Sequence, residues 1–246
     1  MPVALRLPRP AATARGRAAA CLAAAILLGL IVIASLAFGA RDLSPAELWA
    51  GLTRADPIAA TVVWDQRLPR TVVGLLAGAG LAVAGVLMQT LTRNPLADPR
   101  IFGVAAGASL GVVIGLNVLG LTGIGQYVWL GIAGALLAGV VGYAVSTVAA
   151  RTTGGGPATY ALTGAAIDAS LAAVVYAVLA TDVQSFDQYR FWAVGSLAGR
   201  GADVAFGMAP FVLGGLALAL LAARGLDGLQ LGEETAAGLG HRVGLT

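Results

Sequence analysis

Six long apolar runs alternate with short polar segments along this chain, and most of the charged residues lie between the runs. An apolar run of about 20 residues can cross the hydrocarbon core of a bilayer as a helix. The pattern therefore predicts an all-α integral membrane protein, with a polar segment over 225–246 that is too polar to span. We place the spans at about 19–38, 69–91, 101–119, 128–149, 159–179 and 204–222.

The composition supports lipid as the solvent for most of the chain. Hydrophobic residues make up 58% of the sequence and charged residues 11%, whereas a soluble domain carries about 25% charged residues. The net charge of +3 is small and spread through the loops, so no clustered basic face indicates nucleic-acid binding. One cysteine, Cys21, excludes an internal disulfide, and one histidine, His241, argues against a metal centre built from protein ligands. We expect no cofactor and no catalytic residues.

The first apolar run is preceded by residues 1–18, which hold four arginines and no acidic residue. Because cytoplasmic segments are enriched in Arg and Lys, we expect the N-terminus in the cytoplasm. The alternative is a secretory signal peptide cleaved after the sequence AFGA at 37–40. A signal peptide has an apolar region of about 7–15 residues, which is shorter than this run, so we favour a retained first span.

The segment 41–66 is amphipathic and is predicted to lie outside the bilayer core. Ser44 followed by Pro45 and Glu47 is typical of a helix start, with an N-cap, a first-turn proline and an early acid. Trp49 and Trp64 suit the membrane–water interface. We therefore expect a short surface helix on the outer side.

Two features mark the second and third spans. Asn94, Pro95 and Pro99 predict a structural turn between them on the inner side, since a residue before proline is disfavoured in a helix. A glycine ladder then recurs every four residues, which places its members on one helix face and predicts close contact with a neighbouring helix. Its members are Gly103, Gly107, Gly111 and Gly115.

Asp168 falls near mid-depth of the fifth predicted span. A charged carboxyl group there costs a few kcal/mol, and it is by default a candidate functional residue. Two interpretations remain open. Asp168 either lines a transport path, or it is a protonated or hydrogen-bonded group that faces protein or a wet cavity.

Several stretches together resemble the permease subunits of ABC importers for iron-siderophores, haem and vitamin B12, the FecCD type. The stretches occur in the family's order: RLPR at 67–70, RNPLADP at 93–99, GVAAGA at 103–108, ALTGAA at 161–166, FWAVGSL at 191–197 and LQLGEETAAGLG at 229–240. The resemblance implies the type II ABC importer permease fold and transport of a ferric siderophore across the inner membrane. Vitamin B12 or haem is the alternative cargo.

The same resemblance implies the partners: a second permease subunit, two cytoplasmic ATPase subunits and an extracytoplasmic substrate-binding protein. It assigns Arg67 and Arg70 to the docking of acidic residues of the binding protein. Two arginines three residues apart on a helix point the same way and can each grip a carboxylate. The alternative is that they only anchor to lipid headgroups.

The resemblance also assigns the segment after the last span to coupling with the ATPase, whereas an ordinary solvated tail is the alternative. The predicted coupling residues are Leu231, Gly232, Glu233, Glu234, Ala236, Leu239 and Gly240. The chain has no phosphate-binding loop of the G-x-x-x-x-G-K-[ST] kind, so we expect ATP hydrolysis in a separate subunit.

Two departures from the family pattern bear on function. The family usually has ten spans, so six predict a fragment, a truncated product or half of a split permease, and a non-transporting chain that pairs with or regulates the ATPase or a full permease is an alternative function. Asp168 stands where the family usually has a small or neutral residue. A membrane enzyme is disfavoured, because the one polar cluster, Asp182, Asp187 and Tyr189, shows no ligand spacing.

Overall fold

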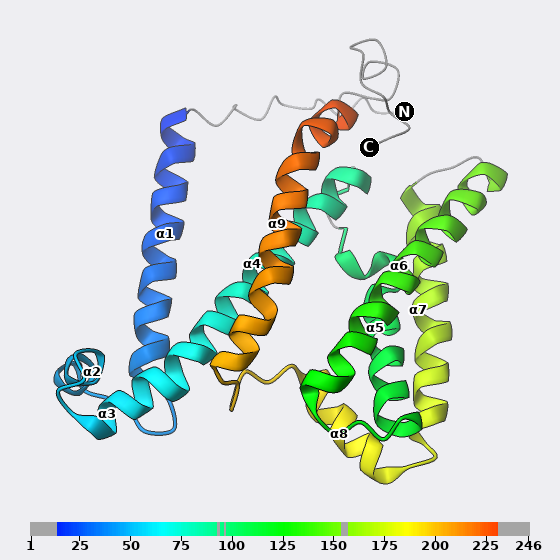
Figure 1. Ribbon diagram of the computed structural model, residues 1–246. Coiled ribbons are helices and arrows are strands. Elements are labelled where there is room, and N and C mark those ends of the chain that lie inside the picture. Colours follow the sequence, from blue (N-terminus) through cyan, green and yellow to red (C-terminus); the bar gives the residue numbers. More distant parts are fainter. Residues whose placement is uncertain (1–13, 93, 96, 154–156, 231–246) are drawn as a thin grey trace, which may run out of the picture. The chain divides into compact units, whose positions relative to one another are not determined.

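The computed structural model describes residues 14–92, 94–95, 97–153 and 157–230 (Figure 1). The described chain divides into two compact units. Of the described residues, the first unit comprises those up to Leu75 together with Gly199–Gly207, and the second comprises those over Leu76–Ala198 and from Met208 onward. Each unit is described by itself below.

The described residues are helical, with short connections. The helices are α1 (Ala14–Ala37), α2 (Pro45–Leu52), α3 (Pro57–Thr61), the π-helix η1 (Val62–Arg67), α4 (Leu68–Thr92), the 3₁₀ helix η2 (Pro99–Phe102), α5 (Val104–Val113), the π-helix η3 (Ile114–Val118), α6 (Ile124–Thr153), α7 (Pro157–Leu179), α8 (Val183–Val194) and α9 (Ala202–Gln230).

Five helices in the described part of the chain are long and apolar enough to cross a membrane. They are Ala14–Ala37, Pro57–Thr92, Gly125–Thr152, Ala161–Leu179 and Ala202–Ala223, and they fall on the first, second, fourth, fifth and sixth predicted spans. Large apolar side chains on these helices, such as Leu81, Leu136 and Leu221, are exposed. Exposed apolar faces of this extent fit an all-helical membrane protein whose surrounding solvent is lipid.

The third predicted span differs from the prediction of a full crossing. The apolar helix here runs only over Val104–Val118, which at about 1.5 Å per residue is about 22 Å long against a hydrocarbon core of about 30 Å. The helix cannot begin earlier because Gly103 has a φ of 73°, a left-handed conformation that ends η2 and starts α5. The predicted start of this element, at residue 101, is therefore too early.

In the first unit, α2 begins as the sequence predicts. Ser44 Oγ accepts a hydrogen bond from the backbone N–H of Glu47, and the backbone N–H of Ser44 donates to Glu47 Oε2 at 2.9 Å, which completes a capping box. The backbone N–H and the hydroxyl group of Ser44 both donate to the Glu47 carboxylate, and together with a bond from Arg41 they hold the pKa of Glu47 below its usual value. The surface helix is therefore fixed at its N-terminus by local side chains.

In the second unit, α5 lies between α6 and α7 (Figure 1). Val113 packs with Val175 and Leu179 of α7, and Val112 and Leu116 pack with Tyr127 of α6. The buried core of this unit is therefore a short helix enclosed by two longer ones.

Candidate functional site

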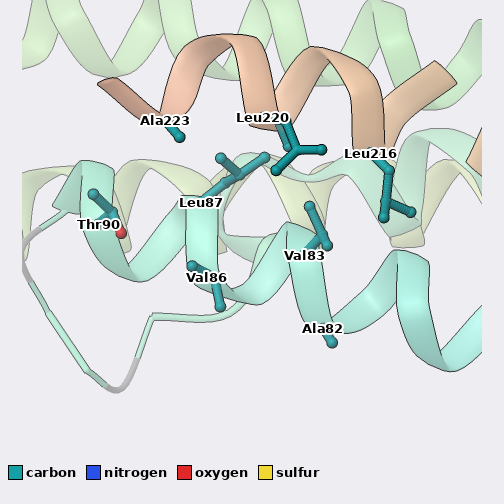
Figure 2. Close-up of a pocket in the computed structure, with 9 residues that line it drawn as sticks. Ala82, Val83, Val86, Leu87, Thr90, Leu216, Leu220 and Ala223 are labelled. Atoms are coloured by element: carbon teal, nitrogen blue, oxygen red, sulfur yellow. The ribbon is translucent and has the colours of Figure 1, made fainter. Parts of the chain in front are cut away.

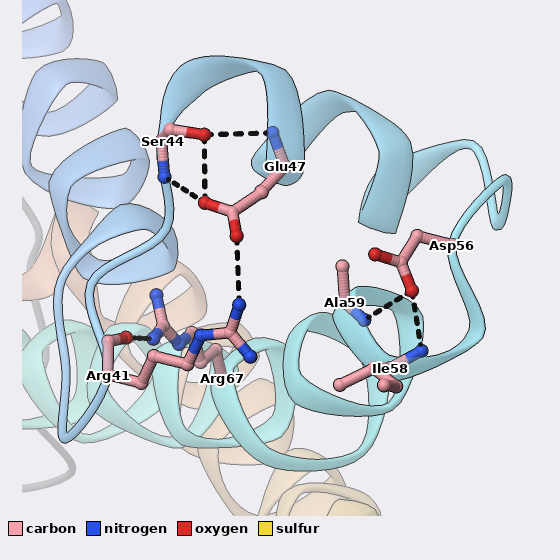
Figure 3. Close-up of polar contacts among 7 residues, drawn as sticks. All are labelled: Arg41, Ser44, Glu47, Asp56, Ile58, Ala59 and Arg67. Atoms are coloured by element: carbon pink, nitrogen blue, oxygen red, sulfur yellow. Dashed lines mark hydrogen bonds and ion pairs between the residues drawn. The ribbon is translucent and has the colours of Figure 1, made fainter.

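Arg67, the first of the two arginines predicted to dock a partner, is buried at the end of η1, with 4% of its surface exposed. Its Nη1 donates hydrogen bonds to the carbonyl oxygens of Leu36 at 2.7 Å and Ala37 at 2.6 Å. Its Nη2 donates to the carbonyl oxygen of Arg41 (Figure 3). The guanidinium group therefore provides hydrogen-bond donors for the carbonyl groups at and just after the C-terminal end of α1.

Arg70 lies one turn further along and reaches the same end of α1. Its Nη2 donates to the carbonyl oxygens of Ser35 at 2.8 Å and Phe38 at 3.3 Å. The hydroxyl groups of Ser35 and Thr71 are hydrogen-bonded at 2.7 Å. We call this set of contacts, made by Arg67, Arg70 and Thr71 with residues 35–41, the α1 latch.

The latch has a clear electrostatic basis. The last carbonyl groups of a helix have no partner within the helix and carry a partial negative charge, which favours cations placed there. The last turn of α1 contains no basic residue of its own. Arg67 and Arg70 supply that charge from a distant part of the chain.

The two predicted docking arginines thus point the same way, as their spacing predicts, but they point toward α1. Arg67 is enclosed in this structure and presents no open face to a partner. Arg70 is half-buried, and within the described residues its Nε and Nη1 atoms have no hydrogen-bond partner. Direct docking by both arginines stays a prediction, and the structure favours Arg70 over Arg67 for it.

Other arginines on the same unit are better exposed than Arg67. The Arg41 side chain is 62% exposed and forms an ion pair with Glu47 at 2.8 Å (Figure 3). The Arg54 guanidinium lies 4.9 Å from the centre of the Trp64 ring, within the range of a cation–π contact. Sequence reasoning did not single out these two residues, because neither belongs to a motif.

The predicted inner turn lies between α4 and η2. The backbone N–H of Asn94 donates to the carbonyl oxygen of Gln89, and the carbonyl oxygen of Asn94 accepts from Ala97. Pro99 is the first residue of η2, where a missing N–H costs nothing, and Asp98 caps this helix. Asn94 and Pro95 thus lie in the connection between the two helices and Pro99 begins η2, and their structural role stays a prediction.

The four glycines of the ladder do not all face the same helix: three face α6 and one faces α7. A Cβ atom on Gly107 would overlap the Gly134 carbonyl oxygen of α6, and one on Gly111 would overlap the Leu130 carbonyl oxygen. A Cβ on Gly115 would lie 2.9 Å from Tyr127 Cβ. Gly103 instead faces α7, because its left-handed conformation places it outside the helix that holds the other three.

Asp168 lies within the span Ala161–Leu179, on the side of α7 that carries the buried residues Gly164 and Val175. Its Oδ1 atom is buried without a hydrogen-bond partner in the described structure. Ser146 Oγ of α6 is buried in the same way. Asp168 does not line either of the two apolar grooves described below, and both interpretations of it stay predictions.

Replacing Asp168 with alanine is expected to raise stability by about 1–3 kcal/mol, because the substitution removes a buried polar atom that lacks a partner. The measurement is thermal unfolding of the purified chain in detergent micelles, followed by tryptophan fluorescence. Asp187→Ala is the control: this exposed acid pairs with Arg190 at 3.2 Å, and such pairs contribute little. A loss of stability in Asp168→Ala would show that the carboxyl group is paired.

Two apolar grooves lie in the second unit. One is formed by α4 and α9 and includes Val83, Leu87 and Leu216 (Figure 2). The other lies along α5, α6 and α7 and includes Gly111, Leu130 and Ile167. Both have almost wholly apolar walls, which suit lipid chains or helices rather than a polar cargo. Among the described residues, no group of three His, Cys, Asp or Glu side chains is placed to hold a metal ion.

The predicted ATPase-coupling residues lie outside the described residues. These are Leu231, Gly232, Glu233, Glu234, Ala236, Leu239 and Gly240. The described part of the last helix ends at Gln230, immediately before them.

The helices and their small-residue contacts define a polytopic α-helical membrane protein. Residues 26–246 match the FecCD transport family, and the chain belongs to this family.

The chain is also similar to transport permeases from several bacteria. The ferric enterobactin transport system permease protein FepD of Escherichia coli K12 is 40% identical over 230 residues, which cover 89% of this chain and 66% of FepD. The Fe(3+)-citrate import system permease protein YfmD of Bacillus subtilis is 35% identical over 215 residues, 85% of this chain and 61% of YfmD. The hemin transport system permease protein HmuU of Yersinia pestis is 34% identical over 224 residues, 89% of this chain and 65% of HmuU.

A solved structure of a metal-chelate type ABC transporter in an inward-facing conformation has the same fold. Its TM-score is 0.72 at 25% identity, with 91% of this chain and 68% of that chain covered. The chain spans about two thirds of the length of these relatives or slightly less.

Proposed function

We propose that this chain is a transmembrane permease subunit of an ABC importer and that its cargo is a ferric siderophore. The supporting observation is the match to the FecCD transport family over 26–246, together with 40% identity to a ferric enterobactin permease. The relatives also include permeases for ferric citrate, cobalamin and haemin, so these chelates are the competing cargoes.

In the proposed importer the chain pairs with a second permease subunit in the inner membrane, with its N-terminus in the cytoplasm. An acidic binding protein meets the end that carries Arg41 and Arg70, and ATPase subunits meet the segment with Glu233 and Glu234. ATP binding on the partner would shift the population between outward- and inward-open states. Among the described residues, no group of three His, Cys, Asp or Glu side chains is placed to hold a metal ion, so we expect the chelate to pass whole.

A second candidate is a non-transporting chain that binds the ATPase or a full-length permease. The chain spans 66% of FepD and 61% of YfmD, so transport by this chain is a proposal that needs its own test. Both candidates predict contact with the ATPase, and only the first predicts transport.

Uptake measurements in proteoliposomes test the proposal. The chain is reconstituted with the ATPase and binding protein of the same organism, and ⁵⁵Fe-labelled ferric enterobactin is supplied. We expect ATP-dependent accumulation that excess ferric citrate, cobalamin or haemin does not suppress. ATPase co-purification without accumulation would support the non-transporting alternative, and suppression by one competitor would reassign the cargo.

Charge reversal at Glu233 and Glu234 to arginine should reduce ATPase co-purification at least about tenfold, equal to about 1.4 kcal/mol. Asp187→Arg, which changes an exposed acid in α8, is the matched control and should leave it unchanged. Unchanged co-purification in the double variant would refute the coupling assignment.

A further inference from the structure

We propose that Arg67 is a positioning residue of the outer docking face and does not itself touch the binding protein. By closing the carbonyl end of α1, it fixes the places of Arg70 and Arg41, the two arginines that meet the partner's acidic surface. This inference rests on the proposed function, since it assumes that a binding protein docks at this end.

The contrast in burial between the arginines carries the first step. Arg67 is 4% exposed, whereas the side chain of Arg41 is 62% exposed. A residue that is enclosed by its own chain must break those contacts before it can reach a partner. Breaking three charge-assisted hydrogen bonds to carbonyl groups is costly, since bonds of this type are about twice as strong as neutral ones.

The second step is that Arg67 contacts the backbone of Arg41 and shares the end of α1 with Arg70. It donates to the carbonyl oxygen of Arg41 itself (Figure 3), so it sets the start of the Arg41 side chain. It also lies one turn before Arg70, and both reach the last carbonyl groups of α1. Loss of Arg67 would therefore displace the two docking groups together.

The third step is that the site fits the shape of a guanidinium group. A planar fork with five N–H donors can serve carbonyl oxygens of Leu36, Ala37 and Arg41 at once, whereas a lysine ammonium is a compact point charge. Gly39 leaves room for the group: a Cβ atom there would lie 3.2 Å from Arg67 Nη2. Size and geometry at this place are therefore matched to arginine.

A disulfide that replaces the latch tests the proposal. Ser35 Oγ and Thr71 Oγ1 lie 2.7 Å apart, so Ser35→Cys with Thr71→Cys should form a bond that holds α1 to α4. Cys21 is changed to alanine in every variant, because it is an exposed free thiol. Affinity for the binding protein of the same organism is measured on chains in nanodiscs, oxidised and reduced.

Arg67→Gln alone should weaken docking at least tenfold, and the oxidised disulfide in the same variant should restore affinity to within about threefold of the parent chain. Reduction should remove the rescue. Arg70→Gln is the matched control: its affinity should fall and the disulfide should not restore it, because Arg70 meets the partner. If the bond fails to form in Arg67→Gln but forms in the parent, the ends have separated, as positioning requires.

Two results would overturn the proposal. Affinity that stays tenfold low in oxidised Arg67→Gln would mean that Arg67 contacts the partner directly. Unchanged affinity in reduced Arg67→Gln would mean that it has no role in docking. If the parent chain itself binds no binding protein, the proposed function fails instead.

The burial of Arg67 in the α1 latch can also be measured without a partner protein. Phenylglyoxal should modify Arg41 and spare Arg67 when the intact chain is labelled in nanodiscs and analysed by mass spectrometry. Equal labelling of the two would contradict the burial on which the inference depends.

Discussion

Alanine at Gly111 is expected to destabilise the chain by about 1–3 kcal/mol or more, the usual cost of overpacking a close contact. The added Cβ atom would overlap the carbonyl oxygen of Leu130 and lie 2.6 Å from its carbonyl carbon. These atoms belong to the backbone of α6, so no side-chain rotation can relieve the clash. The two helices would have to move apart, and the neighbouring contacts of Gly107 and Gly134 would open with them.

Gly85→Ala is the matched control for this prediction. Gly85 also lies within a long helix, α4, but a Cβ atom there meets nothing within 4 Å. Alanine is the better helix former by about 1 kcal/mol, so this variant should be as stable as the parent or more stable. Thermal unfolding in detergent micelles, read by tryptophan fluorescence, compares the two, and equal melting temperatures would contradict the packing assigned to Gly111.

Alanine at Gly103 is expected to have the second large effect, because two costs add there. The φ of 73° strains any residue with a Cβ, by about 1–2 kcal/mol. The same Cβ atom would lie 2.8 Å from Ile167 Cγ2. We therefore expect Gly103→Ala to lose more stability than strain alone would cause.

Gly195 separates the two costs at Gly103. Its φ of 70° is nearly the same, but a Cβ atom there meets nothing within 4 Å. Gly195→Ala should therefore show only the strain. Adding Ile167→Ala to Gly103→Ala should relieve the contact and leave the strain. The melting temperature of Gly103→Ala should therefore lie below those of Gly195→Ala and of the double variant. If Gly195→Ala lost as much stability as Gly103→Ala, the contact with Ile167 Cγ2 would contribute nothing to the effect at Gly103.

Helix content was predictable because of the solvent. In lipid every backbone polar group must be satisfied within the protein, so a long apolar run can only be a helix. Ser44 and Glu47 were predictable for a different reason, since a capping box uses side chains three residues apart. Both signals are local in the sequence.

The shorter third element and the latch were not predictable in this way. Four-residue spacing treats Gly103 like Gly107, although the two differ in φ, and a left-handed residue has no signature beyond glycine itself. The partners of Arg67 are carbonyl groups 26–31 residues earlier. Backbone acceptors look the same at every residue, so only the fold shows which ones an arginine reaches.

Because η1, which ends at Arg67, is a π-helix, the number of residues in this segment matters as much as their types. In η1 the N–H that follows Arg67 bonds back to Val63, five residues earlier, where an α-helix would span four. Deleting one residue from this turn would restore α-helical bonding and rotate everything before it by about 100° about the helix axis relative to Arg67. Among homologues, a one-residue gap here would change which side of α3 faces α2, even if both arginines were kept. Alignments that slide such a gap into a neighbouring loop would hide that difference.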